Sequence, residues 1–262
     1  MTVLRSIVMA FSMFSTIPMP HIEWNEKSMR YALAAFPLVG ALIAVLLGIW
    51  MWICSALGLD RLIMGLGVML IPLAVTGGIH IDGFSDTVDA LASHAEPEKK
   101  RQILKDSHIG AFAGIGIGAY LISYFAIACQ LYYGPLSLQF TICCLCLAPI
   151  LSRTMSGIVS ISFPGSGHKG LLQTFRDSTS KRGALIFLFI LLAACLVFAF
   201  ACISWMVGLG LVIVIVLVTT YLYFMSRHQF GGMSGDLSGF YLQVLEILFL
   251  VVFAIVEGLV FV

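Results

Sequence analysis

Apolar and polar residues alternate along this chain in long blocks. The apolar blocks cover residues 32–56, 62–79, 109–132, 136–152, 183–203, 206–225 and 240–262. Most of them reach the roughly 20 residues that a helix needs to cross a bilayer, because each residue adds about 1.5 Å. The pattern predicts an all-α fold: a polytopic integral membrane helical bundle with about seven transmembrane helices.

The segment at residues 3–20 is also apolar, but Arg5, several serines and two prolines interrupt it. It is too short to span, and it lacks the small-residue cleavage pattern of a signal peptide. We expect an interfacial or re-entrant helix that ends at Pro18 and Pro20. Since neither an internal repeat nor a soluble block is visible, residues 1–262 are expected to form a single integral membrane domain.

The polar blocks between the spans predict the orientation in the membrane. If the chain has seven spans, the four polar blocks all lie on one side of the membrane. That side then also holds 13 of the 14 lysines and arginines, and only Arg61 lies on the other side. The positive-inside rule places that side in the cytoplasm. We therefore expect a multi-pass protein of the cell (inner) membrane whose active site faces the cytoplasm. The polar blocks are 21–31, 80–108, 153–182 and 226–239, and the last three are expected to form the site.

Composition supports the same class. The chain is 60% hydrophobic and 10% charged, whereas soluble domains carry about 25% charged residues. A soluble globular domain is therefore excluded. The net charge of +1 identifies no partner, and we expect contact with the lipid bilayer but with no nucleic acid.

Three aspartates crowd into the stretch HIDGFSDTVDAL, at Asp82, Asp86 and Asp89. On a helix that continues the second span, 100° per residue places all three on one face. Like charges at this spacing destabilise a bare helix by a few tenths of a kcal/mol each. A hard divalent cation, Mg²⁺ or Mn²⁺, would compensate the repulsion. The alternative is a solvated helix end, but the preceding Gly77 and Gly78 loosen the helix and favour a shaped site.

A second acidic stretch, RHQFGGMSGDLSGFYLQVLE, leads into the last span. Its dense glycines predict irregular backbone whose amides are free to contact a phosphate. Asp236 is either a further metal ligand or the N-cap of the final helix. Glu246 falls inside the span, where a buried carboxylate costs several kcal/mol unless it is paired or lies in a wet cavity. We expect Glu246 to belong to the site.

Cations lie between these acidic stretches, in KKRQILKDSHIG and FPGSGHKG. Lys105 and Lys169 are candidates for the site, whereas Lys99–Arg101 are expected to anchor the chain at anionic lipid. Cations beside metal-binding acids indicate a substrate that carries a pyrophosphate.

Glycines recur every fourth residue in the third span, at Gly110, Gly114 and Gly118. A row of small residues lets another helix approach closely. A phosphate-binding loop is the alternative, but nothing nearby resembles one. The row therefore predicts a helix-packing face.

Five motifs carry a resemblance along nearly the whole chain: FSTIPMP, FPLVGALI, GGIHIDGFSDTVDAL, ILKDSHIGAFAGIGI and GGMSGDLSGFYLQVLE. In their order and spacing they resemble the cobalamin-5′-phosphate synthase family, also called adenosylcobinamide-GDP ribazoletransferase. The third and fourth motifs are specific. Ser234 stands where that family leads us to expect Thr, and Phe240 replaces a small residue; both departures are mild.

The resemblance implies a membrane-bound transferase of substituted phosphate groups in cobalamin biosynthesis. Such an enzyme joins adenosylcobinamide-GDP to α-ribazole or its 5′-phosphate, releases GMP and depends on Mg²⁺. Its implied partners are the corrinoid-GDP and α-ribazole substrates. Assembly into a homo-oligomer or with other corrinoid-pathway enzymes stays open.

Combined with this chemistry, the acidic stretches give each candidate residue a role. The metal would be held by Asp82, Asp86 and Asp89, with Asp236 opposite. Lys105 and His108 would neutralise phosphate, and Asp106 would accept the hydroxyl proton. The residues expected to bind substrate are Gly78, His80, Lys169, Arg227, Gly232, Gly235 and Glu246.

Two other classes of function fit part of the pattern. A CDP-alcohol phosphotransferase also carries aspartates on membrane helices, but here Asp86 and Thr87 replace its Ala-Arg, and the tail of its motif is absent. A cation-coupled or proton-coupled transporter could use Glu246 and Glu257. Transporters often show repeated halves with broken helices, and no such symmetry is visible in this sequence.

Overall fold

A computed structural model describes the chain except for residues 1, 107, 134–137, 167–169 and 261–262. The described part is helical, and its strand-like pairing is limited to an isolated bridge between Gly165 and Met233. The expected all-α fold is confirmed. In chain order the helices are α1 (Thr2–Phe14), α2 (Glu26–Met29), α3 (Ala32–Leu57), α4 (Arg61–Thr76), α5 (Ile79–Ala92), α6 (Pro97–Ile103), α7 (Ala111–Tyr133), α8 (Leu138–Ser162), α9 (Leu171–Ser178), α10 (Lys181–Phe198), the π-helix η1 (Ala199–Ile203), α11 (Trp205–Phe230) and α12 (Gly235–Val260).

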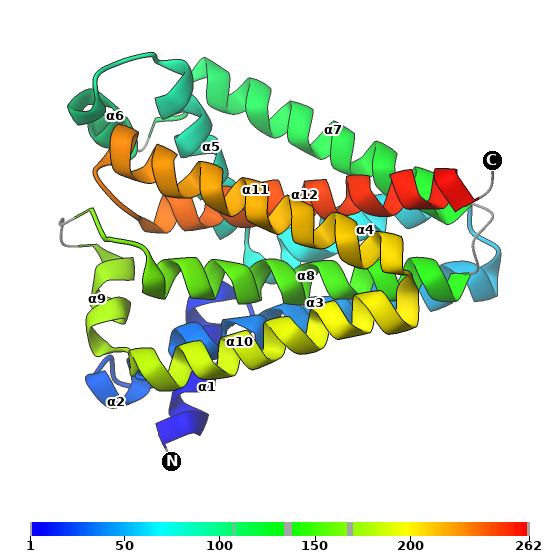
Figure 1. Cartoon of the computed structure of the whole chain (residues 1–262), viewed down its shortest axis with the longest axis horizontal. Coiled ribbons are helices and arrows are strands. Elements are labelled where there is room, and N and C mark those ends of the chain that lie inside the picture. The colour runs from blue at the N-terminus through cyan, green and yellow to red at the C-terminus, as the bar shows by residue number, and fades with distance from the viewer. Residues whose placement is uncertain (1, 107, 134–137, 167–169, 261–262) are drawn as a thin grey trace.

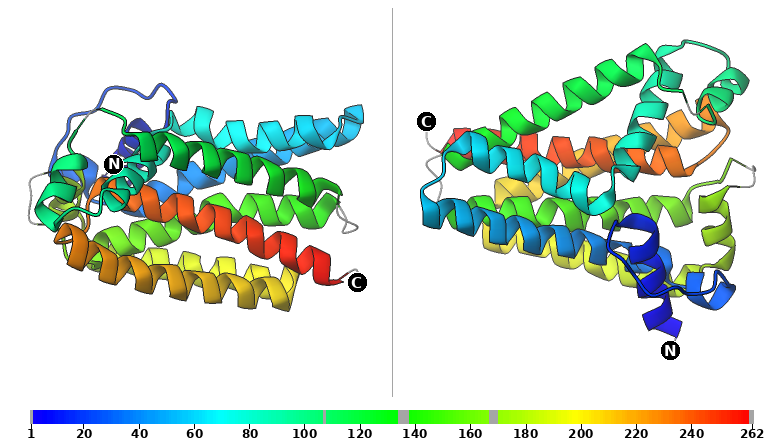
Figure 2. Two further views of the ribbon diagram at one scale, coloured as in Figure 1. Left: turned by 90° about the horizontal axis from the view of Figure 1, so that it is seen from above. Right: turned by 180° about the vertical axis from the view of Figure 1, so that it is seen from behind.

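Six helical spans in the described chain are long and apolar enough to cross a membrane: α3, α7, α8, α10 with η1, α11 and α12. Helices α4 and α5 pass the same test only as a pair, bent by 95° at the break between them. The long helices run along the long axis of the molecule, and the short helices α2, α6 and α9 gather at one end (Figure 1, Figure 2). The prediction of about seven spans is confirmed for six, and the stretch 62–79 forms one arm of the bent pair.

The bend between α4 and α5 comes from two glycines. Gly77 and Gly78 have φ of +62° and +78°, a left-handed conformation that only glycine adopts at no steric cost. The last carbonyls of α4 find donors in the N-terminal segment, since Thr16 N–H and Oγ1 donate to the oxygens of Val75 and Ala74, each at 2.8 Å. The expected acidic helix therefore forms, but it turns across the bundle instead of continuing the span.

Helix α5 crosses α12 with the two backbones in contact. A Cβ atom on Gly83 would lie 2.8 Å from Cα of Asp236, and one on Gly239 would lie 2.9 Å from the carbonyl oxygen of His80. Only glycine permits so close an approach. The crossing holds the acidic face of α5 against the first turn of α12.

The glycine row of the third span does not pack in the expected way. A Cβ atom on Gly114 or Gly118 would meet nothing within 4 Å, so this face of α7 is open. The close contacts are made by Gly110, against the carboxylate of Asp89, and by Gly116, against Val88. Of the predicted packing face, only Gly110 makes a close contact; the prediction is wrong for Gly114 and Gly118, because α7 presents Gly116 to α5 instead.

Helix α8 continues to Ser162, ten residues past the predicted end at 152. Arg153 is therefore not a loop residue: it is buried and pairs with Glu246 of α12. Lys100 was expected at the lipid surface, yet it is also buried, and its ammonium donates to Oε1 of Gln229 at 2.6 Å. Both corrections have one cause, since burial of a long cation depends on a partner that lies far away in sequence.

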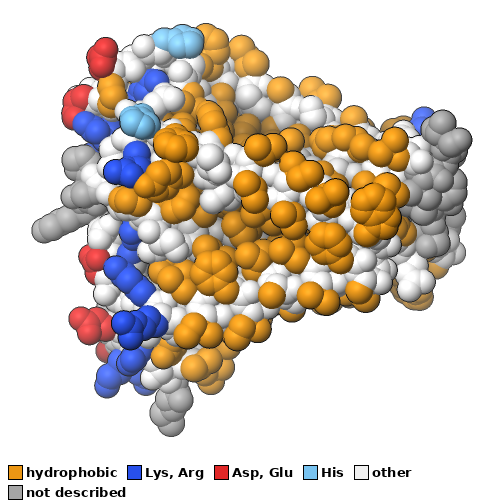
Figure 3. Space-filling model, in the orientation of Figure 1, with side chains coloured by type: hydrophobic (Ala, Val, Ile, Leu, Met, Phe, Trp, Pro, Cys, Tyr) orange, Lys and Arg blue, Asp and Glu red, His pale blue; other side chains and the backbone are white. Residues whose placement is uncertain are grey.

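The surface separates apolar from charged side chains. Apolar side chains cover the flank of the bundle, and charged ones gather at the end that holds α6 and α9 (Figure 3). This distribution is the one expected for a multi-pass membrane protein. Helix α1, with 13 residues, is too short to cross and packs against α3 near the charged end (Figure 2).

We expect Gly83→Ala to lower the midpoint of thermal unfolding in detergent by roughly 3–10 °C, because overpacking costs about 1–3 kcal/mol. The matched control is Gly114→Ala, whose new methyl group enters open space and should leave the midpoint unchanged or raise it slightly. Equal midpoints for both variants would contradict the backbone contact between α5 and α12.

Candidate functional site

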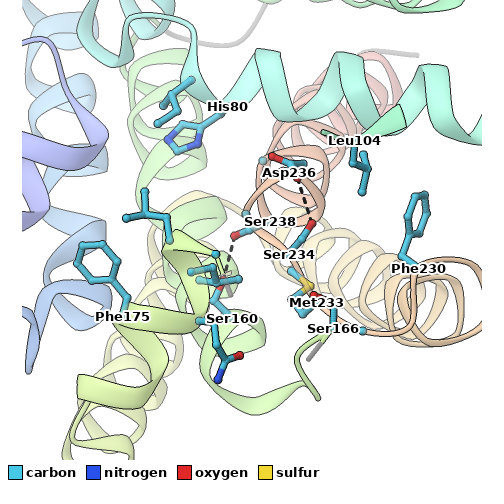
Figure 4. A pocket seen from close by; sticks show the side chains of 18 of the residues that line it. His80, Leu104, Ser160, Ser166, Phe175, Phe230, Met233, Ser234, Asp236 and Ser238 are labelled. Carbon is cyan, nitrogen blue, oxygen red and sulfur yellow. Dashed lines mark hydrogen bonds between the residues drawn. The ribbon is translucent and has the colours of Figure 1, made fainter. Parts of the chain in front are cut away.

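A cavity of about 370 Å³ opens at the charged end of the bundle. Its size falls within the range of small-molecule sites. Its walls come from α1, α3, α5, α6, α8, α9, α11 and α12, from the turn after α6, and from the segments that precede α9 and α12. The three polar blocks expected to form the site thus each contribute to one cavity (Figure 4).

Two carboxylates, Asp82 of α5 and Asp236 of α12, line this cavity. Asp86 does not line it, but it lies near enough for its charge to be repelled by both. Asp236 is not the N-cap of α12, because the N–H of Leu237 donates to Oγ of Ser234 at 3.3 Å. Ser234 takes the capping role, and the carboxylate of Asp236 stays beside the cavity (Figure 4).

The carboxylate of Asp89 contacts the N-terminus of α7 and does not face the cavity. Its Oδ1 accepts a hydrogen bond from the N–H of Ala113 at 3.3 Å, in the first turn of α7. Gly110 leaves room for this carboxylate. A carboxylate at a helix N-terminus satisfies free N–H groups and interacts favourably with the helix dipole. The structure therefore does not bring Asp89 to the cavity wall, although it shares a helix with Asp82.

Two loops form the irregular backbone predicted at the membrane face. The N–H of Met233 donates to the oxygen of Pro164 at 2.8 Å, and the N–H of Ser166 donates to the oxygen of Met233 at 3.3 Å. Gly232 has φ of +140° and lies against Gly165, where a Cβ atom would collide with the other backbone. Gly232 and Gly235 both line the cavity, as expected.

Lys105 lines the cavity, and so does Arg101, which the sequence interpretation had placed at the lipid surface. Arg101 pairs with Glu98, while its Nε is buried without a described partner. The spacing of four residues between Arg101 and Lys105 puts both on one face of a helical turn, a signal that could have identified Arg101. Lys169 lies outside the described residues.

Other predicted residues lie away from the cavity. His108 donates to Asp106 from its backbone N–H at 3.0 Å, and its ring Nδ1 lies 2.7 Å from the same carboxylate oxygen. These hydrogen bonds, the one from the ring foremost, lower the pKa of the Asp106 carboxyl, which makes it a weaker base. Arg227 is exposed and bonds to the hydroxyl of Tyr223. Gly78 makes the bend and does not line the cavity.

Glu246 is also absent from the cavity wall. It is buried against Arg153, and Oγ of Ser152 donates to its Oε1 at 2.9 Å. A carboxylate deep in the bundle needs such partners, because lipid offers none. The cost of burying Glu246 is therefore offset by its pairing with Arg153 and Ser152, and its expected role in the site stays a prediction.

The opposite wall of the cavity is aromatic, which the sequence analysis did not anticipate. Phe14, Phe36 and Phe175 come from α1, α3 and α9, and His80 opens α5 beside them. The three phenyl rings are apolar, and each belongs to a different helix. No local pattern could have grouped them, because only the tertiary fold brings these elements together.

Part of the acidic wall fits a divalent cation. No three His, Cys, Asp or Glu side chains within the described ranges lie close enough to hold an ion by themselves. Mg²⁺, however, usually binds through one or two carboxylates and completes its shell with substrate phosphate and water. Asp82 and Asp236, with Asp86 close by, supply carboxylates of this kind.

These features define a multi-pass membrane protein whose charged end holds a cavity with acids, cations and glycine-rich backbone. The sequence profile of the cobalamin-5-phosphate synthase family matches residues 6–254. Since the match covers most of the chain, the protein belongs to that family, which confirms the resemblance.

Curated relatives agree with this assignment. An adenosylcobinamide-GDP ribazoletransferase of Lachnoclostridium phytofermentans is 33% identical over 98% of this chain and 96% of its own. Relatives with the same name from Clostridium perfringens (strain SM101) and Clostridium botulinum (strain Eklund 17B) are 30% and 31% identical, covering 92% and 93% of this chain and 94% of each relative. No solved structure matches the chain. The CDP-alcohol phosphotransferase and transporter alternatives gain no support.

We expect Glu246→Gln to lower the free energy of unfolding by about 3–5 kcal/mol, because it leaves the buried charge of Arg153 unpaired. The double variant Arg153→Met/Glu246→Leu removes both charges and should regain most of that stability. Unfolding in detergent, followed by circular dichroism, measures both. A double variant that folds but has lost transferase activity would instead place the Arg153–Glu246 pair in the site.

Proposed function

We propose that this protein joins adenosylcobinamide-GDP to α-ribazole, or to its 5′-phosphate, and releases GMP. The ribose hydroxyl of the acceptor attacks the phosphorus linked to cobinamide. A new P–O bond forms, the bond to the bridging oxygen breaks, and GMP leaves with the electron pair. The names of the curated relatives and the family membership support this assignment.

The observation that carries the proposal is the convergence of Asp82, Asp236, Lys105 and Arg101 on one cavity. Phosphoryl transfer needs its charge neutralised and its reactants aligned, with little covalent chemistry from the protein. The basic side chains would hold the diphosphate, and the amides of the loop around Gly232 would contact its oxygens.

A divalent cation, Mg²⁺ by preference or Mn²⁺, is proposed to be held by Asp82 and Asp236, with Asp86 beside them. When bound, such an ion neutralises charge on the phosphate oxygens. The carboxylates themselves would be kept close by the crossing of α5 and α12, despite their mutual repulsion. Asp89, also on α5, would support this arrangement by holding α5 against the first turn of α7.

The cavity is proposed to face the cytoplasm of a cell with the protein in its inner membrane. The charged end of the bundle carries the cavity, and basic side chains gather there (Figure 3). The positive-inside rule predicts that such an end stays in the cytoplasm. A nucleotide-linked substrate would then reach the site without crossing the bilayer.

We expect Asp82→Asn and Asp236→Asn to lower kcat by about 100-fold or more, which is the usual cost of losing one charge-stabilising group at a phosphoryl or acyl centre. Release of GMP by purified protein measures the effect. Asp60→Asn is the matched control: Asp60 caps α4, and Asn caps equally well. Full activity in either cavity variant would rule out the acidic wall.

Removal of divalent cations by EDTA should stop GMP release, and added Mg²⁺ should restore it, because the paired carboxylates need a counter-charge next to the diphosphate. The measurement is a titration of activity against free Mg²⁺, with thermal unfolding followed in parallel. Turnover that continues at excess chelator would contradict the metal-assisted mechanism and leave the transfer itself in place.

A further inference from the structure

His80 carries a polar atom that the fold leaves without a partner. The residue is 6% exposed, lines the cavity, and its Nε2 is buried with no hydrogen-bond partner among the described residues. In Figure 4 the imidazole extends from the start of α5, beside other labelled residues that line the cavity. Buried side-chain nitrogens are nearly always hydrogen-bonded, so an unpaired one at a cavity wall points to a ligand.

Aromatic rings surround this imidazole. The centroid of His80 lies 5.3 Å from that of Phe36 and 6.2 Å from that of Phe14, and the Phe14 ring is only 26° from parallel to it. Phe175 lies 6.3 Å from Phe14 and closes the group. The other ring pairs in this group are tilted by 41° to 53°, and together the phenyl rings make an apolar lining beside the imidazole. The position of His80 is fixed, because its backbone carbonyl lies against Gly239.

We propose that this aromatic end of the cavity binds the fused-ring base of the ribazole acceptor, with His80 donating a hydrogen bond from Nε2 to the free ring nitrogen. This proposal rests on the proposed transferase activity. It assigns the base of the acceptor to the aromatic wall and the guanine nucleotide to the wall with Lys105. A benzimidazole is flat and apolar and offers one unsubstituted nitrogen as an acceptor. The wall offers rings and one ring nitrogen, Nε2 of His80, without a partner among the described residues; in the tautomer with its proton on Nε2, this nitrogen is a donor.

Guanine, the other fused base in the reaction, fits this wall poorly. It presents several donors and acceptors along its edges, and each would lose hydrogen bonds to water on entering an apolar wall. The nearby hydroxyls of Ser160 and Ser238 are already bonded to each other at 2.9 Å. The guanine nucleotide is therefore assigned to the side of the cavity with Lys105 and the glycine loops.

This placement also orients the acceptor. Asp82 follows His80 by two residues and lines the same cavity. A base held at His80 would direct its ribose toward the acidic wall, where the diphosphate is proposed to bind. His80 is thus a specificity residue for the acceptor, separate from the groups that neutralise charge.

The test compares α-ribazole with an analogue in which CH replaces the free ring nitrogen, an indole riboside that keeps the ribose hydroxyls. Wild-type protein should use the analogue with kcat/KM about tenfold lower, the usual effect of leaving a buried donor unpaired. His80→Phe should lower kcat/KM for α-ribazole about tenfold, use both acceptors equally, and leave the KM for adenosylcobinamide-GDP unchanged.

The matched control is His228→Phe, because His228 is exposed and stacks on Phe224 outside the cavity. It should keep wild-type discrimination. Equal use of both acceptors by the wild-type protein would overturn the assignment of His80, even if His80→Phe failed to fold. A His80→Phe effect confined to the KM for adenosylcobinamide-GDP would place guanine at this wall and also overturn it. Absence of GMP release from wild-type protein with the natural pair would instead refute the proposed function.

Discussion

The contact between the backbones of α5 and α12 at Gly83 and Gly239 is the constraint on which the site depends. Because no side chain separates the two helices at these glycines, Asp82 of α5 and Asp236 of α12 line the same cavity. The bend at Gly77 and Gly78 makes this contact possible, since it turns α5 across the bundle. Four glycines thus determine where the carboxylates lie.

Two groups of charged residues in the described chain lie where they do for different physical reasons. Arg153 and Glu246 pair inside the bundle, where lipid offers no partner and the remaining hydrogen bonds come from Ser152 and the oxygen of Pro149. Asp82, Asp236 and Lys105 line a cavity at the charged end, where ligand and water can reach them. The first group stabilises the bundle, and the second is available for chemistry.

The cavity has two chemically distinct walls, and this division matches a reaction between two unlike substrates. An acidic and basic wall with glycine-rich loops suits a nucleotide diphosphate, whereas rings from α1, α3 and α9 suit an apolar heterocycle. Membership of the cobalamin-5-phosphate synthase family is consistent with both walls. Each wall is built by several helices, so the site exists only in the folded bundle.

The sequence by itself determined the membrane class, most of the spans, the acidic helix and the family, because these depend on local composition, spacing and motif order. It could not show that Asp89 caps α7 or that Glu246 pairs with Arg153. Each of those outcomes depends on a partner far away in the chain. Local patterns specify which helices form and which faces are polar; only the tertiary packing decides which polar groups satisfy one another and which remain for a ligand.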